Sequence, residues 1–274
     1  METIPIELAE TAEAEFMYRT ETAASPEDQK VLGLAARRLA GGVALAAAHD
    51  STGYWSKALG FGFASPVDGD LLDAVISVWS DAGATTGVLQ LAPAVLPDDW
   101  ETMRDSRGLE PARNFYKLAA RADRIRPADT DLRVGQVGQE DAEEWARVLL
   151  TGFGMPLEGL AGMMVASTRQ DGFYPYAAWD GDRIAAVGVL SVHEDVGSMH
   201  AGTTLPEYSG RGAQSALIAA RAAHAHELGC RWVVAVGGEP DPGRTNKSLE
   251  NLKRAGLQLL YVRRNLRWRA SAQG

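Results

Sequence analysis

The chain has little cysteine and no long apolar run among its 274 residues. Its single cysteine, Cys230, cannot form an internal disulfide, so nothing in the sequence depends on an oxidising compartment. No apolar stretch approaches the roughly 18 residues that a membrane-spanning helix needs, and the first residues are acidic where a secretory signal would be basic. We therefore expect a cytoplasmic protein with no membrane partner.

An excess of basic residues is also absent. Asp and Glu number 36 against 27 Lys and Arg, which leaves a net charge of −9. Nucleic acid is therefore not expected as a partner, because neutralising phosphates requires clustered Lys and Arg. His224 and His226 are two positions apart on a predicted helix and point to nearly opposite sides, so no metal site is predicted.

Residues 124–132 are polar, contain a proline and interrupt the periodic patterns on both sides, which is typical of a linker. The sequence thus predicts two domains, at residues 1–125 and 131–269. Downstream, the periodicity and turn residues predict helices at 140–150, 212–228 and 246–255, and strands at 173–179, 184–192, 198–205, 231–236 and 257–264.

The first half repeats part of this order, as helix end, strand, helix, glycine and strand. Gly83 aligns with Gly229, and Gly108 aligns with Gly256. This self-similarity predicts an internal duplication. In the second half the elements from residue 231 to 264 predict a βαβ unit.

The most informative stretch is the segment TTLPEYSGRGAQSALI, residues 203–218. A strand ends at a proline, a turn with two glycines follows, and a helix begins at once. Such a turn directs several backbone N–H groups and the positive end of the helix dipole at one point, where a phosphate can bind. Glycine lets the backbone approach that phosphate closely.

The longer string resembles the pyrophosphate-binding motif of the GNAT acetyltransferase superfamily. Tyr208, Gly210, Arg211 and Gly212 match that motif, whereas Ser209 and Gln214 depart from it. A second stretch, residues 245–257, resembles a further family pattern at Ser248, Asn251, Arg254, Ala255 and Gly256. The resemblance covers residues 131–268. It implies an α/β (α+β mixed sheet) fold with two GNAT-like domains, each a mostly antiparallel mixed sheet flanked by helices, the first degenerate and without the coenzyme motif.

The resemblance implies acetyl-CoA, or another acyl-CoA, as cofactor. In the family the strand before the turn holds the pantetheine arm and the thioester by backbone groups, and the turn holds the pyrophosphate. Carried over, the cofactor-binding residues are Thr203, Thr204, Leu205, Ser209, Gly210, Arg211, Gly212, Ala213, Gln214, Ser215, Ser248 and Asn251.

The implied reaction is direct attack of an amine on the thioester, which benefits from a base that takes the ammonium proton. His200, three strand residues before Thr203, is the first candidate for that base, and Glu194 is the second. The tyrosine that protonates the leaving thiolate in many members is replaced at about Leu252, so Tyr261 or Ser248 is the candidate substitute.

The apolar loop at residues 152–156 corresponds to a wall of the acceptor pocket in the family. It makes Phe153 and Met155 the first candidates for substrate contact, followed by Tyr174 and Tyr176. We expect an N-acetyltransferase that acts on a small-molecule amine, as a monomer or homodimer, with the particular acceptor left open. The alternative from another class is a catalytically silent acyl-CoA sensor or interaction module, suggested by the missing tyrosine and by Gln214.

Overall fold

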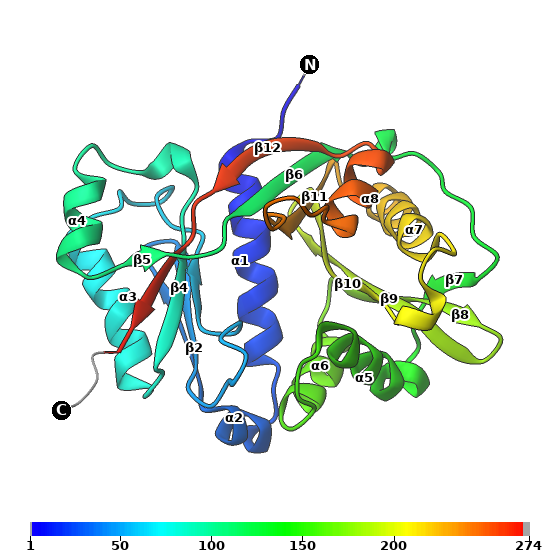
Figure 1. Ribbon diagram of the computed structural model, residues 1–274, viewed down its shortest axis with the longest axis horizontal. Helices are drawn as coiled ribbons and strands as arrows, with labels where there is room; N and C mark the ends of the chain where they lie inside the picture. Colours follow the sequence, from blue (N-terminus) through cyan, green and yellow to red (C-terminus); the bar gives the residue numbers. More distant parts are fainter. Residues whose placement is uncertain (1, 271–274) are drawn as a thin grey trace.

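The computed structural model describes residues 2–270 and contains two mixed β-sheets on either side of a long helix, α1 (Ile6–Thr22) (Figure 1). Within residues 2–270, no helix has both the length and the apolarity that a membrane crossing requires. The predicted mixed, mostly antiparallel α/β architecture is confirmed, because parallel pairing in the described sheets is confined to β3 with β4 and β10 with β11.

The first sheet has six strands in the order β1-β2-β3-β4-β13-β5. Helices α2 (Pro26–Leu32), α3 (Gly69–Asp81) and α4 (Trp100–Ser106) accompany it. Its strands are β1 (Leu34–Leu39), β2 (Gly42–Ala47), β3 (Lys57–Leu59), β4 (Thr86–Gln90), β5 (Glu110–Pro111) and β13 (Leu266–Arg269).

The second sheet has seven strands in the order β12-β6-β11-β10-β9-β8-β7. The strands are β6 (Phe115–Arg121), β7 (Arg133–Gln136), β8 (Phe173–Asp180), β9 (Arg183–His193), β10 (Val196–Thr204), β11 (Trp232–Gly238) and β12 (Gln258–Arg263). The accompanying helices are α5 (Ala142–Phe153), α6 (Leu160–Ser167), α7 (Ala213–Glu227) and α8 (Lys247–Ala255). The strands and helices predicted for this half are confirmed, with ends that differ by a few residues.

The two sheets exchange their last strands. Strand β13 follows β12 in the chain but lies in the first sheet, between β4 and β5, with Leu266 opposite both Leu89 and Pro111. Strand β6 follows β5 but lies in the second sheet, between β11 and β12, with Leu118 opposite both Ala235 and Leu259. The βαβ unit expected from β11, α8 and β12 is therefore split by β6.

This exchange is the same in both halves, which accords with the self-similarity of the sequence. Gly83 and Gly229 follow the ends of α3 and α7, Gly108 and Gly256 follow α4 and α8, and all four have positive φ. Residues 125–132 contain no helix or strand. The domain boundary there stays a prediction, and the exchange means that neither predicted segment holds a complete sheet.

Helix α1 joins the two halves through a shared core. Its Phe16 and Met17 belong to one buried cluster with Leu45 and Leu59 of the first sheet and Val187 of the second. Burial of these side chains removes apolar surface from water on both sides of the helix, at about 25 cal/mol per Å². Packing against α1, which lies between the two sheets, therefore holds them at a fixed relative position (Figure 1).

The same helix carries a buried network of charges. Arg263 of β12 donates to both Glu10 and Glu13 at 3.0 Å, and Lys117 of β6 lies 2.5 Å from Glu13. Tyr261 donates to Glu10 at 2.5 Å. Burial alone would raise the pKa of Glu13, but Arg263 and Lys117 hold that pKa well below its usual value. The Glu13 carboxylate is thus stabilised in its ionised form, and both acids have basic partners.

A further acid of α1, Glu21, is buried without such partners. Its side chain is 1% exposed, and neither carboxyl oxygen has a hydrogen-bond partner among residues 2–270. Burial raises the pKa of Glu21 well above its usual value, against the opposing charge of Lys57. The folded state therefore retains a proton that the unfolded chain releases above pH 4.5, so this residue lowers the free energy of unfolding as pH rises.

We expect Glu21→Gln to remove that pH dependence. Between the unfolded and folded pKa values of Glu21, the wild type should lose about 1.4 kcal/mol of stability per pH unit relative to the variant. Urea unfolding at pH 5, 6 and 7 measures the difference. Glu7→Gln, at an exposed position of the same helix, is the control. Equal pH slopes for the wild type and Glu21→Gln would contradict this account.

Candidate active site

The turn between β10 and α7 has the geometry of an anion site. A short 3₁₀ turn (Pro206–Tyr208) leads into Gly210 and Gly212, whose φ values are 89° and 81°. Gly212 is the N-cap of α7, and no side chain caps the helix there. The first N–H groups of a helix have no intrahelical acceptor, so those of α7 are available to a ligand.

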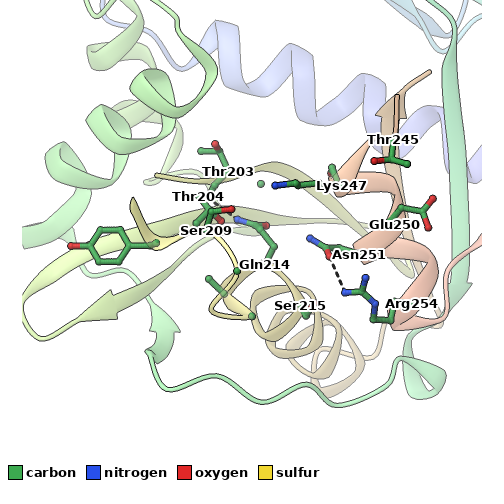
Figure 2. A pocket seen from close by; sticks show the side chains of 16 residues that line it. Thr203, Thr204, Ser209, Gln214, Ser215, Thr245, Lys247, Glu250, Asn251 and Arg254 are labelled. Carbon is green, nitrogen blue, oxygen red and sulfur yellow. Dashed lines mark hydrogen bonds between the residues drawn. The ribbon is translucent and has the colours of Figure 1, made fainter. Parts of the chain in front are cut away.

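An outer cavity of about 690 Å³ opens over this turn. Figure 2 shows Lys247 reaching from α8 towards the Thr203–Thr204 end of β10, while Asn251 and Arg254 form the wall opposite Gln214 and Ser215. Most of the predicted cofactor-binding residues line this cavity, from both the turn region and α8: Thr203, Thr204, Ser209, Gly210, Gly212, Ala213, Gln214, Ser215, Ser248 and Asn251.

Two predicted coenzyme contacts are placed elsewhere. The guanidinium of Arg211 turns away from the cavity to ion-pair with Asp131 at 2.5 Å and Asp180 at 3.0 Å. The N–H of Leu205 donates to the carbonyl of Ala185 on β9, so it is not free for the thioester. Because backbone groups of successive strand residues point to opposite edges, Thr204 presents its N–H and C=O away from β9 instead.

An inner cavity of about 310 Å³ continues from the outer one. Strands β10 and β11 pair in parallel from Val196 opposite Trp232 as far as Met199 opposite Ala235, where pairing ends. Beyond that point both strands continue apart, and the cavity lies in the opening. The gap between β10 and β11 is therefore the inner end of the space that begins over the turn.

A bulge in β10 accompanies the separation of the strands. The register with β9 shifts between His200 and Thr203, and Ala201 has a φ of 54°. Gln214 holds this region by donating to the carbonyls of Thr203 at 2.7 Å and Val187 at 3.1 Å. The departure from the family motif at Gln214 thus has a structural role, tying the start of α7 to β9 and β10.

His200 lines the inner cavity on the side that faces α1. Its ring stacks on Phe16 with 3.8 Å between centroids, and its Nε2 lies 2.6 Å from the Ser198 hydroxyl. Burial lowers the pKa of His200 to about 3, so the imidazole is neutral at physiological pH. Its role as the base stays a prediction, and the low pKa argues against it, because so weak a base takes a proton from an ammonium poorly.

Of the other catalytic candidates, Ser248 lines both cavities, whereas Glu194 and Tyr261 line neither. Glu194 is in the turn between β9 and β10, at the end of β10 remote from Thr204. Tyr261 faces α1, where Glu10 accepts a hydrogen bond from its hydroxyl, and burial raises the pKa of Tyr261 far above the usual value. Proton donation by Tyr261 to a thiolate in the inner cavity therefore has no geometric support.

The four candidates for substrate contact lie in different places, and one of them lines the inner cavity. Phe153 is half exposed and lines the inner cavity, whereas Met155 packs against the core around α1. Tyr176 hydrogen-bonds to His224 at 2.9 Å, and Tyr174 meets the same imidazole edge-on. Of these four residues only Phe153 is placed where an acceptor could touch it.

Several lining residues were not predicted. Tyr54, in the loop before β3, and Phe115 of β6 belong to the first half but line the inner cavity. No local signal could have found them, because only the packing of the halves brings them there. Lys247 and Arg254 of the outer cavity could have been found, since they share a helical face with Asn251 at spacings of four and three residues.

Comparisons with known proteins agree with this geometry. A model of the acetyltransferase (GNAT) domain matches residues 111–242, a range that begins just before the exchanged strand β6. No curated protein sequence matches the chain.

Three solved structures share the fold. A GCN5-related N-acetyltransferase from Kribbella flavida has a TM-score of 0.63 at 12% identity, covering 93% of this chain and 97% of its own. A GCN5-related N-acetyltransferase from Sphaerobacter thermophilus has a TM-score of 0.58 at 14% identity, and the match covers 86% of this chain and 75% of that protein. A tandem GNAT protein from the clavulanic acid biosynthesis pathway has a TM-score of 0.54 at 13% identity, and the match covers 80% of this chain and 76% of that protein. Residues 111–242 thus match the acetyltransferase (GNAT) domain, the chain shares the fold of these GNAT proteins, and its two sheets are consistent with the tandem form of that fold.

Proposed function

We propose that this protein transfers an acyl group, acetyl in the simplest case, from acyl-CoA to the amine of a small molecule. One observation carries the proposal: the uncapped start of α7 opens onto a cavity that continues into the gap between β10 and β11. Backbone amides of the turn would bind the pyrophosphate, and Lys247 and Arg254 would add positive charge beside it.

The thioester would lie at the bulge of β10. The N–H of Thr204, which points away from β9, is the backbone donor best placed for its carbonyl oxygen. The amine nitrogen forms a bond to the carbonyl carbon, the carbon–sulfur bond breaks, and a nitrogen-bound proton passes to the thiolate or to water. The acceptor would enter from the side of Tyr54 and Phe153, opposite α7.

Thiol release from acetyl-CoA, followed with a panel of primary amines, tests this proposal. We expect release that requires both protein and amine, and that rises with pH as the amine loses its proton. With the pKa of His200 at about 3, no inflection from this residue is expected near pH 6.5. A coenzyme-saturated protein that stays inert across the whole panel would contradict the enzymatic function.

Leu252 favours the second candidate, an acyl-CoA sensor. It lines the inner cavity near the position from which a tyrosine would protonate the leaving thiolate. A sensor would bind acyl-CoA and gain thermal stability by mass action without consuming it. The thiol assay separates the two functions, because both predict a thermal shift but only the enzyme predicts amine-dependent turnover.

A further inference from the structure

An arginine with no acidic partner lies beneath the bulge of β10. Arg221 of α7 is 2% exposed, yet it lines the inner cavity. Its Nε donates to the carbonyl of Leu217 at 3.0 Å, and its Nη1 donates to the carbonyls of Val189 at 3.1 Å and His200 at 3.2 Å. Gly188 makes room for the guanidinium, because a Cβ there would lie 2.6 Å from Nη1.

The remaining nitrogen, Nη2, is the part of the guanidinium that a ligand could use. Within residues 2–270 it donates to no protein acceptor, and no carboxylate lies within ion-pair distance of Arg221. A Cβ placed on Gly202 would lie 3.9 Å from Nη2, and Gly202 lines both cavities. The two free N–H groups are thus located where the cavities meet.

The surroundings do not supply the missing negative charge. Glu13, the acid whose charge acts on His200, is already paired with Lys117 and Arg263. Lys57, whose Nζ lies 3.3 Å over the ring of the cavity residue Tyr54, adds a second buried cation. Burial raises the pKa of Glu21 near Lys57 well above its usual value, which disfavours the charge that would offset Lys57. Among the described residues that line the inner cavity, Arg221 is the one with a charged side chain, in a protein whose net charge is −9.

Leaving a charge buried and unpaired is unfavourable, and burial lowers the pKa of Arg221 to about 10. The guanidinium remains protonated at neutral pH. A ligand anion in the inner cavity would offset this cost and receive a charge-assisted hydrogen bond. Carboxylate suits a guanidinium geometrically, since two N–H groups can meet its two oxygens.

Building on the proposed function, we propose that the inner cavity binds a reactant that carries a carboxylate, with Arg221 Nη2 as its donor. The carboxylate could end the acyl group, as in a dicarboxylic acyl-CoA, or belong to the amine, as in an amino acid. In either case a carboxylate would accept hydrogen bonds from the Arg221 guanidinium. Pairs of compounds that differ in the carboxylate alone distinguish an acyl group that carries it from an amine that carries it.

The first arm compares succinyl-CoA with butyryl-CoA, which have acyl chains of equal length, by calorimetric binding. The second compares alanine with alaninamide as acceptors, by kcat/KM for thiol release from acetyl-CoA. We expect the wild type to prefer the carboxylate compound in one arm by about tenfold or more, the size of a charge-assisted hydrogen bond. Which arm shows the preference identifies the source.

Arg221→Gln should abolish that preference, whereas Arg221→Lys should keep part of it. Arg183→Gln, at an exposed position of β9, is the matched control and should keep all of it. The wild-type comparison does not depend on whether a variant folds. Binding of acetyl-CoA without a preference in either arm would overturn this inference alone. Absence of any coenzyme binding would overturn the proposed function together with it.

Discussion

Replacing Gly212 with glutamate is expected to abolish acyl-CoA binding, with a loss of affinity of about 100-fold or more if two charge-assisted hydrogen bonds to backbone amides are lost. Gly212 has a φ of 81°, and a Cβ there would lie 2.8 Å from the carbonyl oxygen of Asp129. The turn must therefore shift, and the new carboxylate would repel the pyrophosphate. Calorimetric titration with acetyl-CoA measures the effect.

Gly229→Glu is the matched control for this prediction. Gly229 has a φ of 86°, a Cβ added there would meet no atom within 4 Å, and the residue follows the opposite end of α7. The control should lose about 1–2 kcal/mol of stability from the left-handed conformation but keep its affinity for acetyl-CoA. If Gly212→Glu bound acetyl-CoA as tightly as the wild type, the turn would not be the coenzyme site.

Arg263→Met is expected to cause the largest loss of stability, about 3–5 kcal/mol in the free energy of unfolding. The substitution leaves Glu10 and Glu13 buried with Lys117 as their remaining cation. It also leaves the Tyr261 hydroxyl as the remaining donor from β12 to these two acids of α1. Urea unfolding at pH 7, followed by circular dichroism, measures the change.

Arg38→Met tests the same helix at its surface. Arg38 is 52% exposed and pairs with Glu15, so its loss should cost less than about 1 kcal/mol. The buried network behaves differently with pH, because Arg263 and Lys117 lower the pKa of Glu13. The stability that this ion pairing contributes is present above pH 4.5 and is lost as the pH falls through the lower pKa of Glu13 in the folded state. Similar losses for both variants at pH 7 would show that the buried network contributes no more than a surface pair.

The local elements of the second half could be predicted because each has its own signal in the chain. Segments rich in apolar residues, bounded by short turns at residues 180–182 and 195–197, marked β8, β9 and β10, and the Ala-rich segment ending at Gly229 marked α7. The turn at Gly210 and Gly212 could be located for the same reason, since the positive φ that such a turn adopts before a helix favours glycine. These features depend on residues that are neighbours in sequence.

The catalytic candidates were less well predicted. The three-residue spacing placed His200 near the thioester, and it does line the inner cavity, but the spacing carried no information about Phe16 stacking on the ring or about the burial that lowers its pKa. Tyr261 was selected for its chemistry, whereas its orientation towards Glu10 depends on where α1 packs. A side chain's surroundings come from segments distant in the chain.

The sequence by itself determined the order of strands and helices in the second half, the glycine turn at the start of α7, and the resemblance of that turn to the GNAT motif. Only the tertiary structure decided that β6 and β13 exchange sheets, that Tyr54 and Phe115 reach the inner cavity, and that Arg221 lies under the β10 bulge without a counter-ion. The physical reason is that periodicity and turn chemistry act over a few residues. Strand partners and buried charge are set by which distant surfaces pack together.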